Sequence, residues 1–161
     1  MPKVISHLWF AEKAREAVAH YVSLIPNSKV IRTSGVPAET PSGPPGSVTI
    51  IEFTLGDQHF TALEAGPLDP FNHSFSIQVL CDTQEEIDRI WDGLLADGGA
   101  TEQCGWLRDR WGLCWQIVPR VLIEMVDDPD RAAAKRATEA MLGMIKLDIA
   151  GLERAFSASP T

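Results

Sequence analysis

Hydrophobic and polar residues follow two spacings along this chain, and the spacings alternate in the same order in both halves. In the first half, the apolar run VISHLWF predicts a strand. The segment AEKAREAVAHYVSLIP places apolar residues at i, i+3, i+4 and i+7, which is typical of an amphipathic helix. The runs SKVIRTSG, VTIIEFTL and QHFTALE predict three further strands, the last two joined by a hairpin turn at Gly56 and Asp57. The first half therefore reads βαβββ.

The second half repeats this order. HSFSIQVLC alternates as a strand does, and TQEEIDRIWDGLLADGG has helical spacing, with Thr83 and Glu86 placed as a capping box and Gly98 and Gly99 expected to end the helix. Three short strand candidates follow in ATEQCG, WLRDRW and LCWQIVP. The pattern predicts an α+β fold in which residues 1–66 and 70–120 form paired modules of one domain, residues 1–126.

The composition changes after this domain. From Asp127 the chain is alanine-rich and helical in period, which predicts a C-terminal helical appendage over residues 127–161, with Gly143 and Gly151 as expected breaks. Residues 36–46, VPAETPSGPPG, are rich in proline and glycine. They predict a plain connector, with a mobile lid as the alternative.

Composition narrows the function classes. The 161 residues are 45% hydrophobic and 22% charged, which suits a globular protein. The formal charge is -8 and the basic residues are scattered, so we expect no nucleic-acid partner. Three cysteines without CxxC spacing predict neither a disulfide framework nor a thiolate zinc site. No run of about 18 apolar residues suggests a membrane span, and we expect a cytoplasmic protein.

Five stretches taken in order resemble the vicinal oxygen chelate superfamily, which includes glyoxalase I, extradiol dioxygenases, and bleomycin and fosfomycin resistance proteins. Within it they are most similar to the PhnB-like group labelled 3-demethylubiquinone-9 3-methyltransferase. The resemblance implies that each module curls its sheet into a half-barrel, that paired modules enclose a cleft for a small organic molecule, and that the protein is a homodimer. The stretches are HLWFAEKAREAVAHYVSLIPNSKV, SVTIIEFTLGDQHFTALEAGP, FNHSFSIQVLCDTQEEIDRIWDGLL, QCGWLRDRWGLCWQIVP and AMLGMIKLDIAGLERAF.

The resemblance also implies a metal site. The superfamily's four ligand positions fall on His7, Glu64, His73 and Gln116, a donor set that suits Zn²⁺, Ni²⁺, Fe²⁺ or Mn²⁺. Such a metal would polarise a carbonyl or enediolate oxygen. Two alternatives stay open: His7 as a hydrogen-bonded core histidine with no metal bound, and Glu64 as a catalytic general base.

The same resemblance points to substrate-binding candidates in QCGWLRDRW. Cys104, Trp106 and Asp109 match family positions, and Trp106 or Trp111 would line an apolar pocket. Strand packing is the alternative role for each of them. Cys104 could act as a nucleophile only beside a base or a cationic partner.

Three functions follow from these residues. The first is metal-assisted lyase, isomerase or oxygenase chemistry on a small molecule, and the second is metal-free sequestration of a drug or metabolite. The third is the methyltransfer named by the family label. A Rossmann-type methyltransferase needs a glycine-rich turn after its first strand, but HLWF is followed here by AEKAREA. We therefore expect no nucleotide cofactor and no S-adenosylmethionine.

Overall fold

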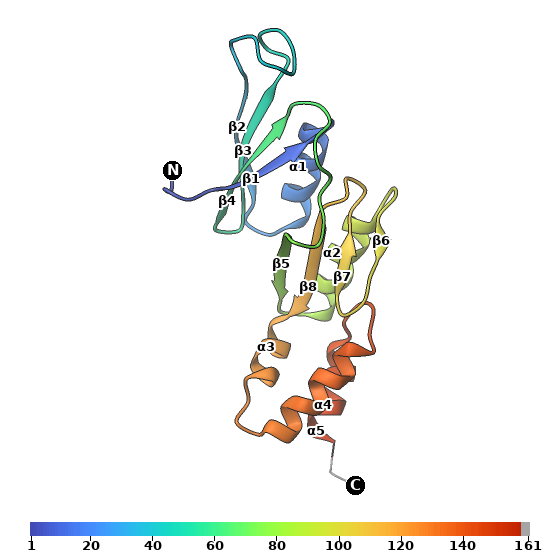
Figure 1. Ribbon diagram of the computed structural model, residues 1–161. Coiled ribbons are helices and arrows are strands. Elements are labelled where there is room, and N and C mark those ends of the chain that lie inside the picture. The colour runs from blue at the N-terminus through green and yellow to red at the C-terminus, as the bar shows by residue number, and fades with distance from the viewer. Residues whose placement is uncertain (159–161) are drawn as a thin grey trace. The chain divides into compact units, whose positions relative to one another are not determined.

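The computed structural model describes residues 1–158 and contains eight strands and five helices in this part of the chain (Figure 1). In chain order they are β1 (Ser6–Phe10), α1 (Ala14–Leu24), β2 (Lys29–Gly35), β3 (Thr49–Leu55), β4 (Gln58–Glu64), β5 (Ser76–Cys81), α2 (Gln84–Leu95), β6 (Ala100–Thr101), β7 (Trp106–Arg108), β8 (Cys114–Pro119), α3 (Arg120–Val126), α4 (Arg131–Leu142) and α5 (Ile149–Ser157).

Both halves form the predicted βαβββ module. The first sheet has the strand order β1-β4-β3-β2 and the second has the order β5-β8-β7-β6. In each sheet the first strand of the module pairs parallel to the last one, and all other neighbours are antiparallel. The chain divides into two compact units, Met1–Pro70 and Phe71–Thr161, so each module has its own core and the C-terminal helices group with the second.

The first unit buries one face of its sheet against α1. Alternate residues of the strands, among them Leu8, Phe10 and Ala62, are at most 3% exposed. The aromatic rings of Phe53 and Phe60 stack across β3 and β4 with their centroids 5.3 Å apart. The helix stripe that packs in this unit comprises Ala14, Ala17, Val18 and Tyr21, as the spacing predicts.

The second helix begins where the sequence predicts. The Thr83 hydroxyl accepts a hydrogen bond from the backbone N–H of Glu86 at 3.2 Å, which caps the helix. The Glu86 carboxylate accepts in return from the N–H of Asp82, 3.4 Å away, one residue before the N-cap. The helix ends at Leu95, earlier than the predicted Gly98 and Gly99. At Gly99 a Cβ would lie 2.7 Å from the Leu95 Cα, so glycine permits the close return of the chain.

The C-terminal residues form three helices grouped at the end of the second sheet, where β8 leads into α3 (Figure 1). The first of them, α3, lies in a segment for which the sequence predicted no helix. Gly143 follows α4 as predicted, but the predicted break at Gly151 is wrong. Gly151 lies inside α5, where its backbone N–H donates to the carboxylate of the capping residue Asp148 at 3.2 Å. Residues 159–161 of the predicted appendage lie outside the described residues.

A single hydrophobic cluster joins these helices to the second sheet. Because β8 contributes to it, the end of the strand and the appendage share one core. The buried members of the cluster are Val118, Leu122, Met125, Ala137, Leu147 and Leu152.

Within the described residues, no helix is both long and apolar enough to cross a membrane.

Candidate functional site

The second sheet presents a polar face away from its core. The side chains of Leu107, Trp115 and Ile117 are fully buried, so their neighbours in β7 and β8 point to the opposite side. Strand register places those neighbours side by side, because Arg108 pairs with Cys114 and Trp106 with Gln116. We call this the open face of the second sheet; its members are Ser76, Gln78, Trp106, Arg108, Cys114 and Gln116.

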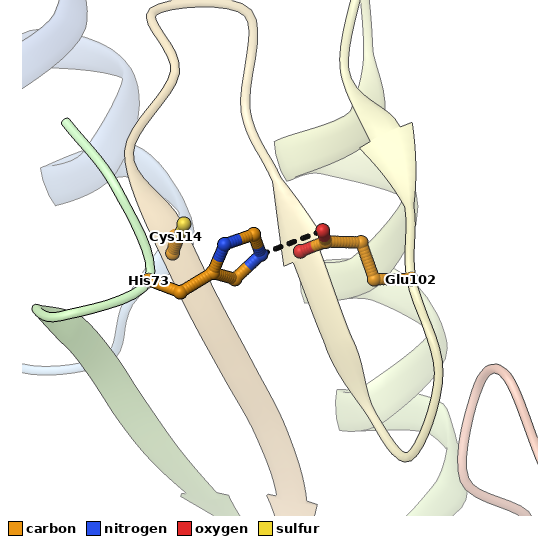
Figure 2. A group of neighbouring side chains, drawn as sticks. All are labelled: His73, Glu102 and Cys114. Carbon is orange, nitrogen blue, oxygen red and sulfur yellow. Dashed lines mark hydrogen bonds and ion pairs between the residues drawn. The ribbon is translucent and has the colours of Figure 1, made fainter. Parts of the chain in front are cut away.

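Three side chains of types that can ligate a metal gather at one end of the open face. Glu102 lies between β6 and β7, Cys114 begins β8, and His73 precedes β5. The His73 Nε2 lies 2.7 Å from the Glu102 Oε2, and the donor atoms of all three residues lie within 4.8 Å of one another. Figure 2 shows the imidazole ring between the Cys114 sulfur and the Glu102 carboxylate.

Hydrogen bonds determine the tautomer of His73. The Arg108 guanidinium lies 3.2 Å from the His73 Nδ1, and a guanidinium can only donate. Nδ1 therefore accepts, and in the neutral ring Nε2 carries the proton and donates to Glu102. Without metal the ring is thus held from both sides, by a cation at one nitrogen and a carboxylate at the other. A metal would take the lone pair of Nδ1 in place of the Arg108 N–H, because Nε2 carries the proton.

The thiol of Cys114 is protonated in the metal-free site. Burial raises its pKa, the carboxylates of Glu102 and Asp109 raise it further, and the Arg108 cation opposes them. A neutral thiol is a poor nucleophile, and Cys114 is also fully buried. Divalent metals deprotonate the thiols that coordinate them, so the chemistry of this sulfur favours a ligand over a nucleophile.

The donor set fits a divalent metal. Imidazole, carboxylate and thiolate are all zinc ligands, and tetrahedral coordination separates neighbouring donors by about 3.5 Å, which is compatible with donor atoms that all lie within 4.8 Å of one another. The second carboxylate oxygen of Glu102, Oε1, is buried and has no hydrogen-bond partner among the described residues. A buried oxygen without a partner is costly for a carboxylate, and a cation would compensate it.

The ligands predicted for the first unit lie on opposite faces of its sheet. His7 is exposed, and its Nδ1 lies 2.6 Å from the Thr61 hydroxyl on the neighbouring strand β4. Glu64 lies three residues further along β4, on the side of the buried Phe10, and its Oε1 accepts from the N–H of Ala14 at 2.7 Å. A carboxylate at the start of α1 stabilises the helix.

The two ligands predicted for the second unit both lie at the open face. His73 belongs to the three-residue group, and Gln116 is two positions along β8 from Cys114. The Gln116 amide donates to the Ser76 hydroxyl at 2.9 Å and accepts from the Gln78 amide at 3.3 Å. A site shared by all four predicted residues stays a prediction.

The predicted substrate-binding residues have different surroundings. Trp106 lies on the open face with its ring centroid 6.0 Å from that of His73, whereas Trp111 stacks under the Arg110 guanidinium at 4.2 Å. Cys104 lies in a left-handed turn, and its sulfur contacts the Leu142 carbonyl at 3.8 Å. Of these three, Trp106 adjoins the group formed by His73, Glu102 and Cys114.

Asp109 organises the turn between β7 and β8. It is 3% exposed, and its Oδ1 accepts from the backbone N–H groups of Trp111 and Leu113 at 2.9 and 3.1 Å. Its Oδ2 accepts from the indole Nε1 of Trp115 at 2.9 Å. These bonds engage both carboxylate oxygens within the fold.

Neither Glu102 nor Cys114 was predicted from the sequence as a ligand. A signal for Cys114 was present, because it precedes Gln116 by two residues and must share its face of a strand. Glu102 had no comparable signal, because it lies outside the regular strands and its direction depends on the conformation of a turn.

Comparisons with known proteins place this arrangement in a family. Residues 2–118 match the family model described as 3-demethylubiquinone-9 3-methyltransferase. The PhnB protein of Bacillus cereus is 30% identical, and the match covers 73% of this chain and 99% of that chain with a TM-score of 0.62. Among curated proteins, none matches this chain.

More distant solved structures share the fold. The fosfomycin resistance protein FosX of Mesorhizobium loti is 15% identical, covering 80% of this chain and 100% of that chain with a TM-score of 0.53. The glyoxalase I of Leishmania major is 11% identical, covering 86% of this chain and 97% of that chain with a TM-score of 0.52. The fold is therefore that of the vicinal oxygen chelate superfamily. Within it, this chain belongs to the PhnB-like, 3-demethylubiquinone-9 3-methyltransferase family.

Proposed function

We propose that this protein binds a divalent metal through His73, Glu102 and Cys114 and uses it to bind a small organic anion on the open face of the second sheet. The observation that carries the proposal is the convergence of the three donor atoms within 4.8 Å. When bound, the metal would supply a Lewis acid that polarises an oxygen of the ligand, as lyase, isomerase or oxygenase chemistry requires.

The charges of the site support an anionic ligand. A divalent cation is balanced by the Glu102 carboxylate and the Cys114 thiolate, which leaves the Arg108 guanidinium as a net positive charge. Arg108 has no carboxylate within ion-pair distance among the described residues, and its contact with His73 uses one of five donors. A guanidinium in this position favours a carboxylate or phosphonate group.

Metal content is the first test. The protein, purified without chelator or affinity-tag metal, is analysed for first-row metals by mass spectrometry and then titrated with Zn²⁺. We expect one metal for each chain, lost in Cys114→Ser and in His73→Ala but retained in Cys81→Ser, the matched control for a buried cysteine. Retention in Cys114→Ser with loss in His7→Ala would instead favour the four-position site.

Ligand class is tested with oxalate, a small dianion with two neighbouring oxygens. Calorimetry on the zinc-loaded protein should show oxalate binding. We expect the affinity to fall by about 10- to 100-fold in Arg108→Gln, because this variant loses one charge-assisted hydrogen bond. Arg110→Gln is the control, because Arg110 pairs with Asp97 at 2.9 Å and lies in the adjoining turn. Equal effects of the two variants would contradict a ligand role for Arg108.

Metal-free sequestration is the second candidate function. It is favoured by the hydrogen-bonded amides of Gln78 and Gln116, which offer polar contacts without a metal. Oxalate binding that persists at full strength in Cys114→Ser, with no metal bound, would support this candidate. For methyltransfer, the connection from Phe10 to Ala14 still offers no glycine, and we expect no S-adenosylmethionine binding in calorimetry.

A further inference from the structure

The turn that carries Glu102 is held by the C-terminal appendage. Two consecutive backbone N–H groups of this turn, those of Cys104 and Gly105, donate to the carbonyls of Met144 and Ile145 at 2.9 and 2.8 Å. The accepting residues lie between α4 and α5, beyond the last residue that the family model matches. A segment from outside the family region therefore holds the backbone two residues from a proposed metal ligand.

The turn has an unusual backbone that needs such support. Cys104 has a φ of 59° and Gly105 a φ of 84°, both in the left-handed region, which costs energy for a residue with a Cβ. A Cβ on Gly105 would lie 2.9 Å from the Leu147 Cδ1 and 2.9 Å from the Ile117 carbonyl oxygen. Leu147 is fully buried, and its side chain packs directly against the turn.

The segment that holds the turn, residues 144–147, is itself anchored to α2. The Gln84 side chain donates to the Leu147 carbonyl at 3.1 Å and accepts from the Ile149 N–H at 2.8 Å. An ion pair joins Lys146 to Asp88 at 2.9 Å. The backbone at Leu147 is therefore held by α2, while the Leu147 side chain lies against the turn.

We propose that Leu147 is a positioning residue that fixes the direction of Glu102 toward the metal. The backbone N–H of Glu102 donates to the Trp106 carbonyl at 3.0 Å across the same turn, so a shift at Gly105 is transmitted to the ligand. This inference rests on the proposed metal site. It goes beyond that site by assigning the appendage a role in metal binding.

Two leucines of one cluster make a matched test. Leu147 and Leu152 are both fully buried in the C-terminal cluster, but of the two only Leu147 is among the nearest atoms that a Cβ at Gly105 would meet. Co²⁺ is titrated into the full chain and followed by its thiolate charge-transfer and ligand-field absorption. We expect Leu147→Ala to weaken Co²⁺ binding at least tenfold and to shift the ligand-field bands. Leu152→Ala loses a similar amount of packing. We expect its Co²⁺ affinity to remain within about twofold of that of the natural protein, because Leu152 is not among the nearest atoms at Gly105.

Amide hydrogen exchange at Cys104 and Gly105, measured without metal, reports independently on their hydrogen bonds to Met144 and Ile145. Faster exchange in Leu147→Ala together with unchanged Co²⁺ affinity and bands would overturn the positioning role while leaving the metal site intact. Equal losses in the two leucine variants would overturn it as well. A natural protein without a thiolate band in Co²⁺ would overturn the proposed function itself. Leu147→Val, a smaller truncation, supplies the same comparison if Leu147→Ala does not fold.

Discussion

Replacing the Asp109 carboxylate by an amide tests whether this residue supports the fold or binds substrate. In Asp109→Asn the shape of the side chain is kept, but its charge is lost and one oxygen becomes an NH₂ group. The two backbone bonds at Oδ1 would survive as neutral hydrogen bonds. At the position of Oδ2, the new NH₂ group would face the indole N–H of Trp115, a fully buried residue. Two hydrogen-bond donors would then oppose each other.

The expected cost follows from these contacts. Each of the two backbone bonds loses its charge assistance, about 1 kcal/mol apiece, because hydrogen bonds to charged groups are worth about twice neutral ones. The buried Trp115 N–H loses its carboxylate acceptor, which costs about 1–3 kcal/mol. We therefore expect Asp109→Asn to lower the free energy of unfolding by about 3–5 kcal/mol. Asp97→Asn is the control, because Asp97 is 81% exposed and its ion pair with Arg110 is worth about 1 kcal/mol at most.

Urea unfolding measures this difference. Tryptophan fluorescence and far-ultraviolet circular dichroism should give coincident transitions, with similar denaturant slopes for both variants and the natural protein. If Asp109→Asn were as stable as Asp97→Asn, the structural role argued here would be wrong. If it were also unable to bind oxalate, Asp109 would be a substrate ligand, as the sequence first suggested.

Three further predictions address other parts of the chain. Thr83→Ala should lower the free energy of unfolding by about 1 kcal/mol through loss of the α2 cap, seen in urea unfolding. Burial raises the pKa of the Cys81 thiol to about 12, with Glu86 adding to the effect. Iodoacetamide at pH 8 should therefore modify Cys81 only after unfolding. Between pH 9 and 12 the folded state keeps a proton that the unfolded state releases, so stability should fall more steeply in the natural protein than in Cys81→Ala. We expect a homodimer, so light scattering should give twice the chain mass of 17.7 kDa.

Much of the fold followed from local pattern. Alternation predicted the strands of both modules, and the spacing of Thr83 and Glu86 predicted the start of α2. The end of that helix was misplaced because Gly99 serves a close return of the chain rather than a cap. Gly151 was wrongly predicted as a break. Asp148 caps a helix that begins at the next residue, and Gly151 lies inside this helix, where the absence of a side chain leaves space for packing.

The site was less accessible to prediction. Period-two alternation places Cys114 and Gln116 on one face, so part of the open face is encoded in β8 itself. His73 and Glu102 come from segments outside the regular strands, and their meeting depends on backbone turns. For Glu102 that turn is completed by Leu147, which is distant in sequence, and no local spacing reports such a contact.

The coordination of zinc in the loaded protein tests the central proposal most directly. X-ray absorption at the zinc edge distinguishes sulfur from nitrogen and oxygen by distance. The His73, Glu102 and Cys114 site predicts one sulfur at about 2.3 Å with nitrogen and oxygen at about 2.0–2.2 Å, and loss of the sulfur in Cys114→Ser. Zinc surrounded by nitrogen and oxygen alone in the natural protein would contradict it and favour a site built on His7, Glu64, His73 and Gln116.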